Sequence, residues 1–156
     1  MHRPMRRKDR QSTTEEAVGL LKRAEYGILA TTDEISQPYA VPLSYAYTEN
    51  RIYFHCATEG HKLDNIKAND KVSFAVVGAT QVLPDKFSTA FESAVVFGKA
   101  SFVEDEQEKV AALKALIEKY SKDFWEEGLA YINRAAAATC VVRIDIEHMT
   151  GKNRDE

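Results

Sequence analysis

Residues 53–66 contain the side chains whose types and spacing could do chemistry in this chain. An apolar strand runs into a short polar loop containing Gly60, and a helix then opens on His61 and Lys62. The first N–H groups of a helix have no partner within it, and the helix dipole makes that end positive. With Thr58 added, this arrangement predicts a pocket for a phosphate group. The other interpretation is that Lys62 is a surface lysine and His61 an ordinary first-turn residue.

The strand expected at residues 38–47 alternates in a way that bears on this pocket. One face carries the larger side chains Tyr39, Val41, Leu43, Tyr45 and Tyr47, and the other carries Ala40, Pro42, Ser44 and Ala46. A strand face of small residues either packs closely on another backbone or leaves room for a flat ligand. Pro42 cannot donate to a ladder, so this strand is expected at a sheet edge or a bulge.

Length and composition restrict the class of protein. The 156 residues are enough for one domain with its own core, so residues 1–156 are expected to form a single domain with a basic arm at 1–11. A formal net charge of −3 gives no basic field for nucleic acid or acidic membranes. No apolar run approaches the ~20 residues that span a bilayer, and no apolar segment follows the basic amino terminus. The two cysteines, Cys56 and Cys140, form no disulfide framework and lack metal-site spacing, which favours a cytoplasmic location.

The elements that must position these residues follow from periodicity and capping. Thr13 and Glu16 fit a capping box for a first helix that stops near Gly27, and Asp105 can cap a later one. A helical piece at 125–137, broken near Gly128, is also expected. Strands are expected at 27–32, 38–47, 51–55, 71–77, 91–103 and 139–146, with a loop at 78–88 and a polar tail from Gly151. The sequence therefore predicts a mainly β fold with inserted helices, a small six-stranded antiparallel barrel.

Common catalytic motifs are missing from the sequence. It contains no G-x-G-x-x-G, G-x-x-x-x-G-K-[ST], H-E-x-x-H or G-x-S-x-G, and its four histidines are too scattered for a local metal motif. His55 ends a strand, where it could be a structural histidine or a ligand. Cys56 has no basic cluster beside it in sequence and is expected to be inert.

Seven segments of the chain resemble the Nim-type nitroimidazole-resistance proteins, in the same order and spacing. They are MRRKDR (5–10), AEYGILAT (24–31), QPYAVPLSY (37–45), IYFH (52–55), EGHKLDNI (59–66), SAVVFGKA (93–100) and MTGK (149–152). Those proteins belong to the pyridoxamine 5′-phosphate oxidase-like group. The resemblance implies an FMN-binding split β-barrel that forms a homodimer, with the flavin in a cleft between the subunits.

The same resemblance implies positions for the cofactor. The strand at 41–44 would lie along the isoalloxazine ring, and the loop at 55–62 would hold the ribityl chain and phosphate. The cofactor-binding residues would be Val41, Pro42, Leu43, Ser44, His55, Cys56, Ala57, Thr58, Gly60, His61 and Lys62. His61 could also act as a catalytic proton donor, because an imidazole exchanges protons near neutral pH.

Two functions are compatible with these features. The first is an FMN-dependent oxidoreductase that reduces a small, flat, electron-poor substrate such as a nitroimidazole or nitroaromatic compound. The second is a non-catalytic flavin- or haem-binding protein of the same fold, because one fold supports several functions.

Overall fold

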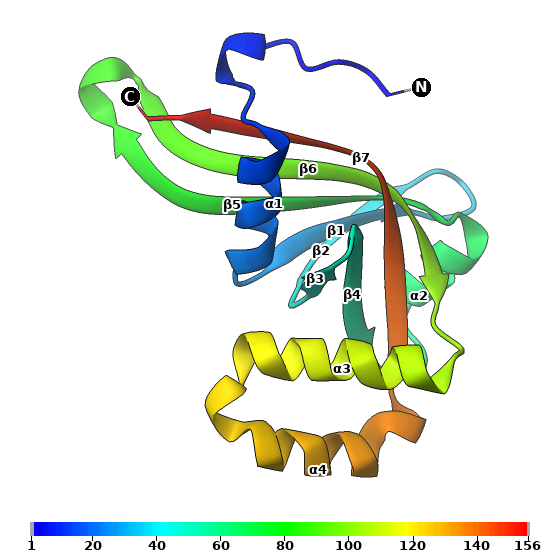
Figure 1. Ribbon diagram of the computed structural model, residues 1–156. Helices are drawn as coiled ribbons and strands as arrows, with labels where there is room; N and C mark the ends of the chain where they lie inside the picture. Colours follow the sequence, from blue (N-terminus) through cyan, green and yellow to red (C-terminus); the bar gives the residue numbers. More distant parts are fainter. Residues whose placement is uncertain (1, 156) are drawn as a thin grey trace.

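The computed structural model describes residues 2–155, which form one antiparallel sheet curled into a partly closed barrel (Figure 1). Seven strands are present within this range, in the order β2-β1-β5-β6-β7-β4-β3. Their bounds are β1 Gly27–Thr32, β2 Pro38–Leu43, β3 Ala46–Thr48, β4 Arg51–Cys56, β5 Lys71–Leu83, β6 Ser88–Phe102 and β7 Cys140–Arg154. The mainly β, antiparallel barrel with inserted helices is confirmed, with seven strands in place of the expected six.

The extra strand arises because the expected strand at 38–47 is divided in two. Its halves, β2 and β3, lie at opposite edges of the sheet. Between them, the N–H of Tyr45 is hydrogen-bonded to the hydroxyl of Tyr120 (3.1 Å) and not to a neighbouring strand. Pro42 lies in the edge strand β2, where its missing N–H costs no hydrogen bond between strands.

In the described part of the chain, four α-helices and four short 3-10 turns precede or connect these strands. Their bounds are η1 Lys8–Arg10, α1 Thr14–Arg23, α2 His61–Ala68, η2 Pro84–Lys86, α3 Glu106–Tyr120, η3 Lys122–Phe124, α4 Trp125–Ala135 and η4 Ala136–Ala138. The capping box of Thr13 and Glu16 is present, and Asp105 caps α3 through the N–H of Glu108. The expected break near Gly128 is wrong. This glycine lies inside α4, where a Cβ atom would come within 2.7 Å of Ile117, so its small size lets the two helices approach.

Strands β5, β6 and β7 extend further than the sequence suggested. The expected loop at 78–88 is mostly strand, because β5 continues to Leu83 and pairs with the beginning of β6. A register shift between Val77 and Thr80 carries the pairing past Gly78. The expected polar tail from Gly151 is likewise part of β7, whose Arg154 pairs with Phe91. These long strands run across the top of Figure 1 beyond the barrel.

Two groups of buried residues stabilise the fold. The larger one fills the barrel with side chains from α1, α2 and the strands, including Leu21, Leu29, Phe54, Leu63 and Phe74. The smaller one lies between the helical pair α3–α4 and the sheet, and it includes Ala46, Tyr53, Leu113, Leu116, Ile132 and Val141. The α3–α4 pair therefore forms a separate layer, seen below the barrel in Figure 1.

The basic arm lies against its own chain. Gln11 forms a bridge with Lys152 of β7, and the His2 ring stacks on His148 with centroids 4.9 Å apart. Within residues 2–155, no helix combines the length and apolar character needed to cross a membrane.

Candidate functional site

The candidate site begins where β4 ends and α2 begins. Gly60 stands before α2 with φ 155° and ψ 169°, a backbone conformation that side chains disfavour. It offers no side chain to cap the helix, in contrast to Thr13 of α1 and Asp105 of α3. The first N–H groups of α2 therefore lack a side-chain cap, which is the arrangement that binds anions at helix ends.

A ring contact joins this helix start to the edge strand β2. The Tyr39 and His61 rings stack with centroids 4.0 Å apart and planes at 29°. Along β2 the side chains of Val41 and Leu43 pack against the barrel core, while Pro42 is exposed. The predicted alternation holds as far as Ser44, where Ala40, Pro42 and Ser44 are exposed. It is wrong beyond that point, because the chain leaves β2 and both Tyr45 and Ala46 are buried.

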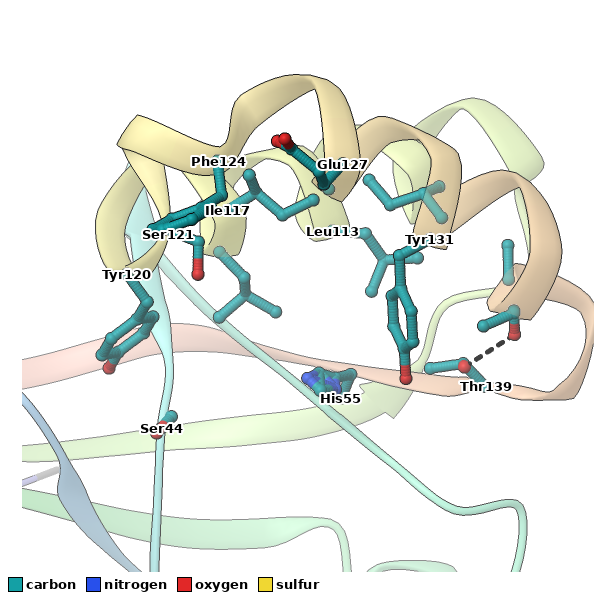
Figure 2. Close-up of a pocket in the computed structure, with 15 residues that line it drawn as sticks. Ser44, His55, Leu113, Ile117, Tyr120, Ser121, Phe124, Glu127, Tyr131 and Thr139 are labelled. Atoms are coloured by element: carbon teal, nitrogen blue, oxygen red, sulfur yellow. Dashed lines mark hydrogen bonds between the residues drawn. The ribbon is translucent and has the colours of Figure 1, made fainter.

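A cavity of about 530 Å³ lies between the α3–α4 pair and the strands (Figure 2). Ser44 and His55 line it from the sheet, and Tyr120, Phe124 and Tyr131 line it from the helical side. Its other lining residues are mostly apolar: Leu113, Leu116, Ile117, Ser121, Glu127, Gly128, Ile132, Ala135, Ala136 and Thr139. A cavity with apolar walls and few polar groups is typical of small-molecule sites.

His55 is a polar group on the sheet side of this cavity. Among residues 2–155, no group is hydrogen-bonded to its imidazole. Partial burial lowers the pKa of the imidazole below its usual value. At neutral pH the ring is therefore uncharged, with one nitrogen available to donate a hydrogen bond and one to accept.

The helical wall of the cavity is held to the barrel by specific hydrogen bonds. The Tyr120 hydroxyl donates to the carbonyl of Glu25 (2.6 Å) and accepts from the N–H of Tyr45 (3.1 Å). Near the other end of α3, Glu108 accepts from the hydroxyl of Tyr53 (2.7 Å) and from Arg143 (2.9 and 3.0 Å). These contacts fix α3, and through it α4, over His55 of β4 and over Ser44, which lies between β2 and β3.

The sequence-predicted site residues divide into two groups by orientation. The side chains of Val41, Leu43 and Cys56 pack against the barrel core, so a ligand outside the barrel would meet their main chain. The exposed or partly exposed group consists of Pro42, Ser44, His55, Ala57, Thr58, Gly60, His61 and Lys62. Ser44 and His55 come together at the cavity, whereas His61 lies with Tyr39 at the start of α2.

Lys62 is half-buried and influences a neighbouring thiol. Burial raises the pKa of Cys56 to about 11, nearby Cys140 adds to the rise, and the charge of Lys62 opposes it. A thiol with so high a pKa carries little thiolate at neutral pH, so Cys56 reacts slowly as a nucleophile there.

The helical wall of the cavity was not predicted as part of a site. Leu113, Leu116, Ile117 and Tyr120 were visible in the sequence only as an apolar helical stripe, which is typical of any packed helix. Phe124 and Tyr131 are 64% and 57% exposed, and exposed aromatics at helical spacing are the signal that could have indicated a ligand surface.

The curled antiparallel sheet, with an edge strand beside a helix start and a helical pair over one end, defines a split β-barrel. The chain belongs to the pyridoxamine 5′-phosphate oxidase family, whose sequence profile matches residues 13–153.

Solved structures of related proteins share this fold. A candidate 5-nitroimidazole antibiotic resistance protein from Bacteroides thetaiotaomicron is 26% identical, with a TM-score of 0.78 over 90% of this chain and 84% of that chain. An FAD-binding protein from Mesorhizobium loti is 24% identical, with a TM-score of 0.68 over 94% and 98%. An FAD- and haem-binding protein from Mycobacterium smegmatis is 19% identical, with a TM-score of 0.82 over 94% and 74%.

Proposed function

We propose that this protein is an FMN-dependent oxidoreductase that reduces a small, flat, electron-poor substrate such as a nitroimidazole or nitroaromatic compound. The observation that carries the proposal is the exposed small face of β2, which has an uncapped helix start near one end and the apolar cavity at the other. Membership of the family and the similarity to the candidate nitroimidazole-resistance protein support it.

The dimensions of the site fit a flavin mononucleotide. From Tyr39 to Ser44 the chain advances roughly 17 Å at about 3.3 Å per strand residue, which suits a ring joined to a phosphate by a ribityl chain. We place the ring along Pro42 and Ser44, and the phosphate at the first N–H groups of α2 with Lys62 and His61. The residues of the connecting loop, Ala57, Thr58 and Gly60, are exposed and would meet the ribityl chain.

The protein's own residues have limited and specific roles in this proposal. Bound FMN would supply the electron-transfer chemistry, while the chain positions it and the substrate. The cavity walls exclude water from a flat substrate, and the neutral His55 can hydrogen-bond to it. The sequence suggested His61 as a catalytic proton donor, but in this placement it lies with Tyr39 at the phosphate end of β2, away from the cavity. We therefore assign His61 to phosphate binding.

Purified protein tests the proposal directly. We expect flavin absorption bands, release of FMN on denaturation, and loss of nitro absorbance when NADH or NADPH and a nitroimidazole are added. Release of FAD, the cofactor named for two of the related proteins, would mean that FAD is the cofactor in place of FMN. It would not contradict the reductase function. Absence of turnover with either donor would contradict the reductase function.

A homodimer with the flavin at the subunit interface is part of the proposal. On one face of the long strands, Val77, Val95 and Phe97 are 58%, 37% and 37% exposed. Exposed apolar side chains gathered on neighbouring strands are typical of an association surface. Light scattering after gel filtration should give twice the monomer mass of 17.6 kDa; a monomer that still binds FMN would exclude the interface site.

A second function is a non-catalytic flavin- or haem-binding protein. The observation favouring haem is the uncharged His55 at an apolar cavity, because a neutral imidazole is a common axial ligand of haem iron. Titration of the purified protein with haem would then give a Soret band that His55→Ala abolishes.

The two free thiols suit the reducing cytoplasm, which we keep as the proposed compartment.

A further inference from the structure

The two cysteines of the chain lie directly opposite each other on neighbouring strands. Cys56 is the last residue of β4, Cys140 is the first residue of β7, and the two are cross-strand partners. Residues opposite each other in an antiparallel pair project to the same face, with Cα atoms about 4.5 or 5.5 Å apart. Both values lie within the span of about 4.4–6.8 Å that a disulfide requires.

Both cysteines are partly buried and pack against the barrel core, and Cys140 is close enough to raise the pKa of Cys56. Within residues 2–155 no group of three or more histidine, cysteine or acidic side chains is placed to hold a metal ion. We propose that Cys56 and Cys140 are a site of reversible oxidation, at which a hydroperoxide converts the two thiols into an intrachain disulfide.

The reaction balances with hydrogen peroxide as the oxidant. One cysteine, as thiolate, attacks the O–O bond and forms a sulfenic acid, while the departing hydroxide takes up the proton that the thiol released and leaves as water. The second thiol then attacks the sulfenic sulfur, the S–S bond forms, and a second water leaves. Two thiols and one peroxide thus give one disulfide and two waters. Because burial raises the pKa of Cys56 to about 11, its attack is slow at neutral pH and speeds up as pH rises.

The location gives this bond a structural consequence. Residues 57–60 follow Cys56 and lead into α2, while η4 and Thr139 lead from α4 into Cys140. A disulfide would tie the loop before α2 to the end of the helical pair that covers the cavity. It would also close a loop of residues 56–140, which restricts the unfolded chain and should raise the melting temperature by on the order of 10 °C.

Thiol counting on the full chain tests the proposal without any cofactor, so its outcome is independent of the proposed flavin chemistry. Protein treated with hydrogen peroxide at pH 7 and pH 9 is alkylated with N-ethylmaleimide and weighed intact. We expect both thiols to disappear together with the loss of two hydrogen atoms, faster at pH 9, with a higher melting temperature. Dithiothreitol should restore both thiols.

Single-cysteine variants provide the control. Cys56→Ser and Cys140→Ser should gain oxygen atoms and show no peroxide-induced rise in melting temperature. In the wild type, three results would overturn the proposal: oxygen uptake without paired thiol loss, thiol loss only in disulfide-linked dimers, or no thiol loss at pH 9. The wild-type mass decides between these outcomes even if a variant folds poorly.

Discussion

The ring of Tyr39 lies on the imidazole of His61, with centroids 4.0 Å apart. This contact joins the first turn of α2 to the edge strand β2, two elements separated in sequence by β3 and β4. It brings an exposed strand with small side chains beside a helix start without a side-chain cap. The candidate flavin site depends on this proximity, because neither element could hold a whole cofactor alone.

Replacing Lys62 with alanine tests where the phosphate binds. A cation at the helix start contributes about 1 kcal/mol to anion binding, so the Kd for FMN should rise roughly fivefold. The melting temperature without ligand should barely change. The matched control is Lys67→Ala, in the last turn of the same helix, which should leave the affinity unaltered. Unchanged FMN fluorescence quenching in Lys62→Ala would place the phosphate elsewhere.

Removing the charge of Glu108 tests what holds the cavity wall in place. In Glu108→Gln the charged partner of Arg143 and Tyr53 is lost, which should lower the free energy of unfolding by about 1–2 kcal/mol in urea denaturation. Glu118→Gln, whose partner Lys122 is 3.7 Å away at the surface, should change it by less than about 0.5 kcal/mol.

The difference in free energy of unfolding between the wild type and Glu108→Gln should depend on pH. The hydrogen bond from Tyr53 and the ion pair with Arg143 lower the pKa of Glu108 in the folded protein. A carboxyl group with a lowered pKa in the folded state stabilises the protein above its unfolded pKa of about 4.3. That stabilisation is lost as pH falls through the folded pKa. The wild type and Glu108→Gln should therefore converge at acid pH, and a constant gap would show that the charge is not responsible.

Local signals in the sequence predicted most of the fold. The capping box of Thr13 and Glu16 predicted the start of α1. The strands expected at 38–47 and 51–55 left residues 48–50 for a connecting turn, and Glu49 and Asn50 there have positive φ angles. The register between β6 and β7 shifts between Phe97 and Gly98, and a glycine inside a strand is a common sign of such a bulge. The continuation of β5 through Gly78 was missed because it depends on pairing with β6, which overrides the local preference of glycine and Pro84 for a loop.

The candidate site was only half visible in the sequence. The small face of β2 and the polar start of α2 are local patterns, so they could be read from residues 38–47 and 55–62. The cavity depends on how α3 packs against α4 and over β4. Apolar periodicity marks Leu113 and Ile117 as facing inward, but it does not distinguish a packed core from the wall of a cavity.

Two glycines should respond in opposite ways to alanine. In Gly98→Ala the new Cβ would lie 2.5 Å from the carbonyl oxygen of Asp145, which should cost about 3 kcal/mol and lower the melting temperature by roughly 6–12 °C. Gly19 lies inside α1 with nothing within 4 Å of the Cβ position. Gly19→Ala should stabilise the helix by about 0.5–1 kcal/mol and raise the melting temperature by roughly 1–4 °C. Equal responses in thermal unfolding would show that crowding at Gly98 is relieved by backbone movement.

Lys119 should make stability increase with pH in the alkaline range. Its Nζ lies 3.7 Å from the centroid of the Tyr45 ring and donates to the Tyr45 carbonyl (3.0 Å). Burial lowers the pKa of Lys119 to about 8, whereas an unfolded lysine titrates near 10.4. Between these values the unfolded chain binds more protons than the folded one, so the free energy of unfolding rises with pH.

Melting temperatures of the wild type and Lys119→Met, measured from pH 7 to 9.5, isolate this contribution. The range stops at pH 9.5 because the pKa of Tyr45 is raised in the folded protein. Tyrosine ionises near pH 10 in the unfolded chain, so above that pH Tyr45 makes the free energy of unfolding fall as pH rises. The wild type should gain stability relative to Lys119→Met as pH rises through 8, and Lys114→Met, at an exposed position of the same helix, should not show this relative change. A wild type that instead loses stability relative to Lys119→Met would mean that the charged amine is favoured in the fold, by its contacts with the Tyr45 ring and carbonyl.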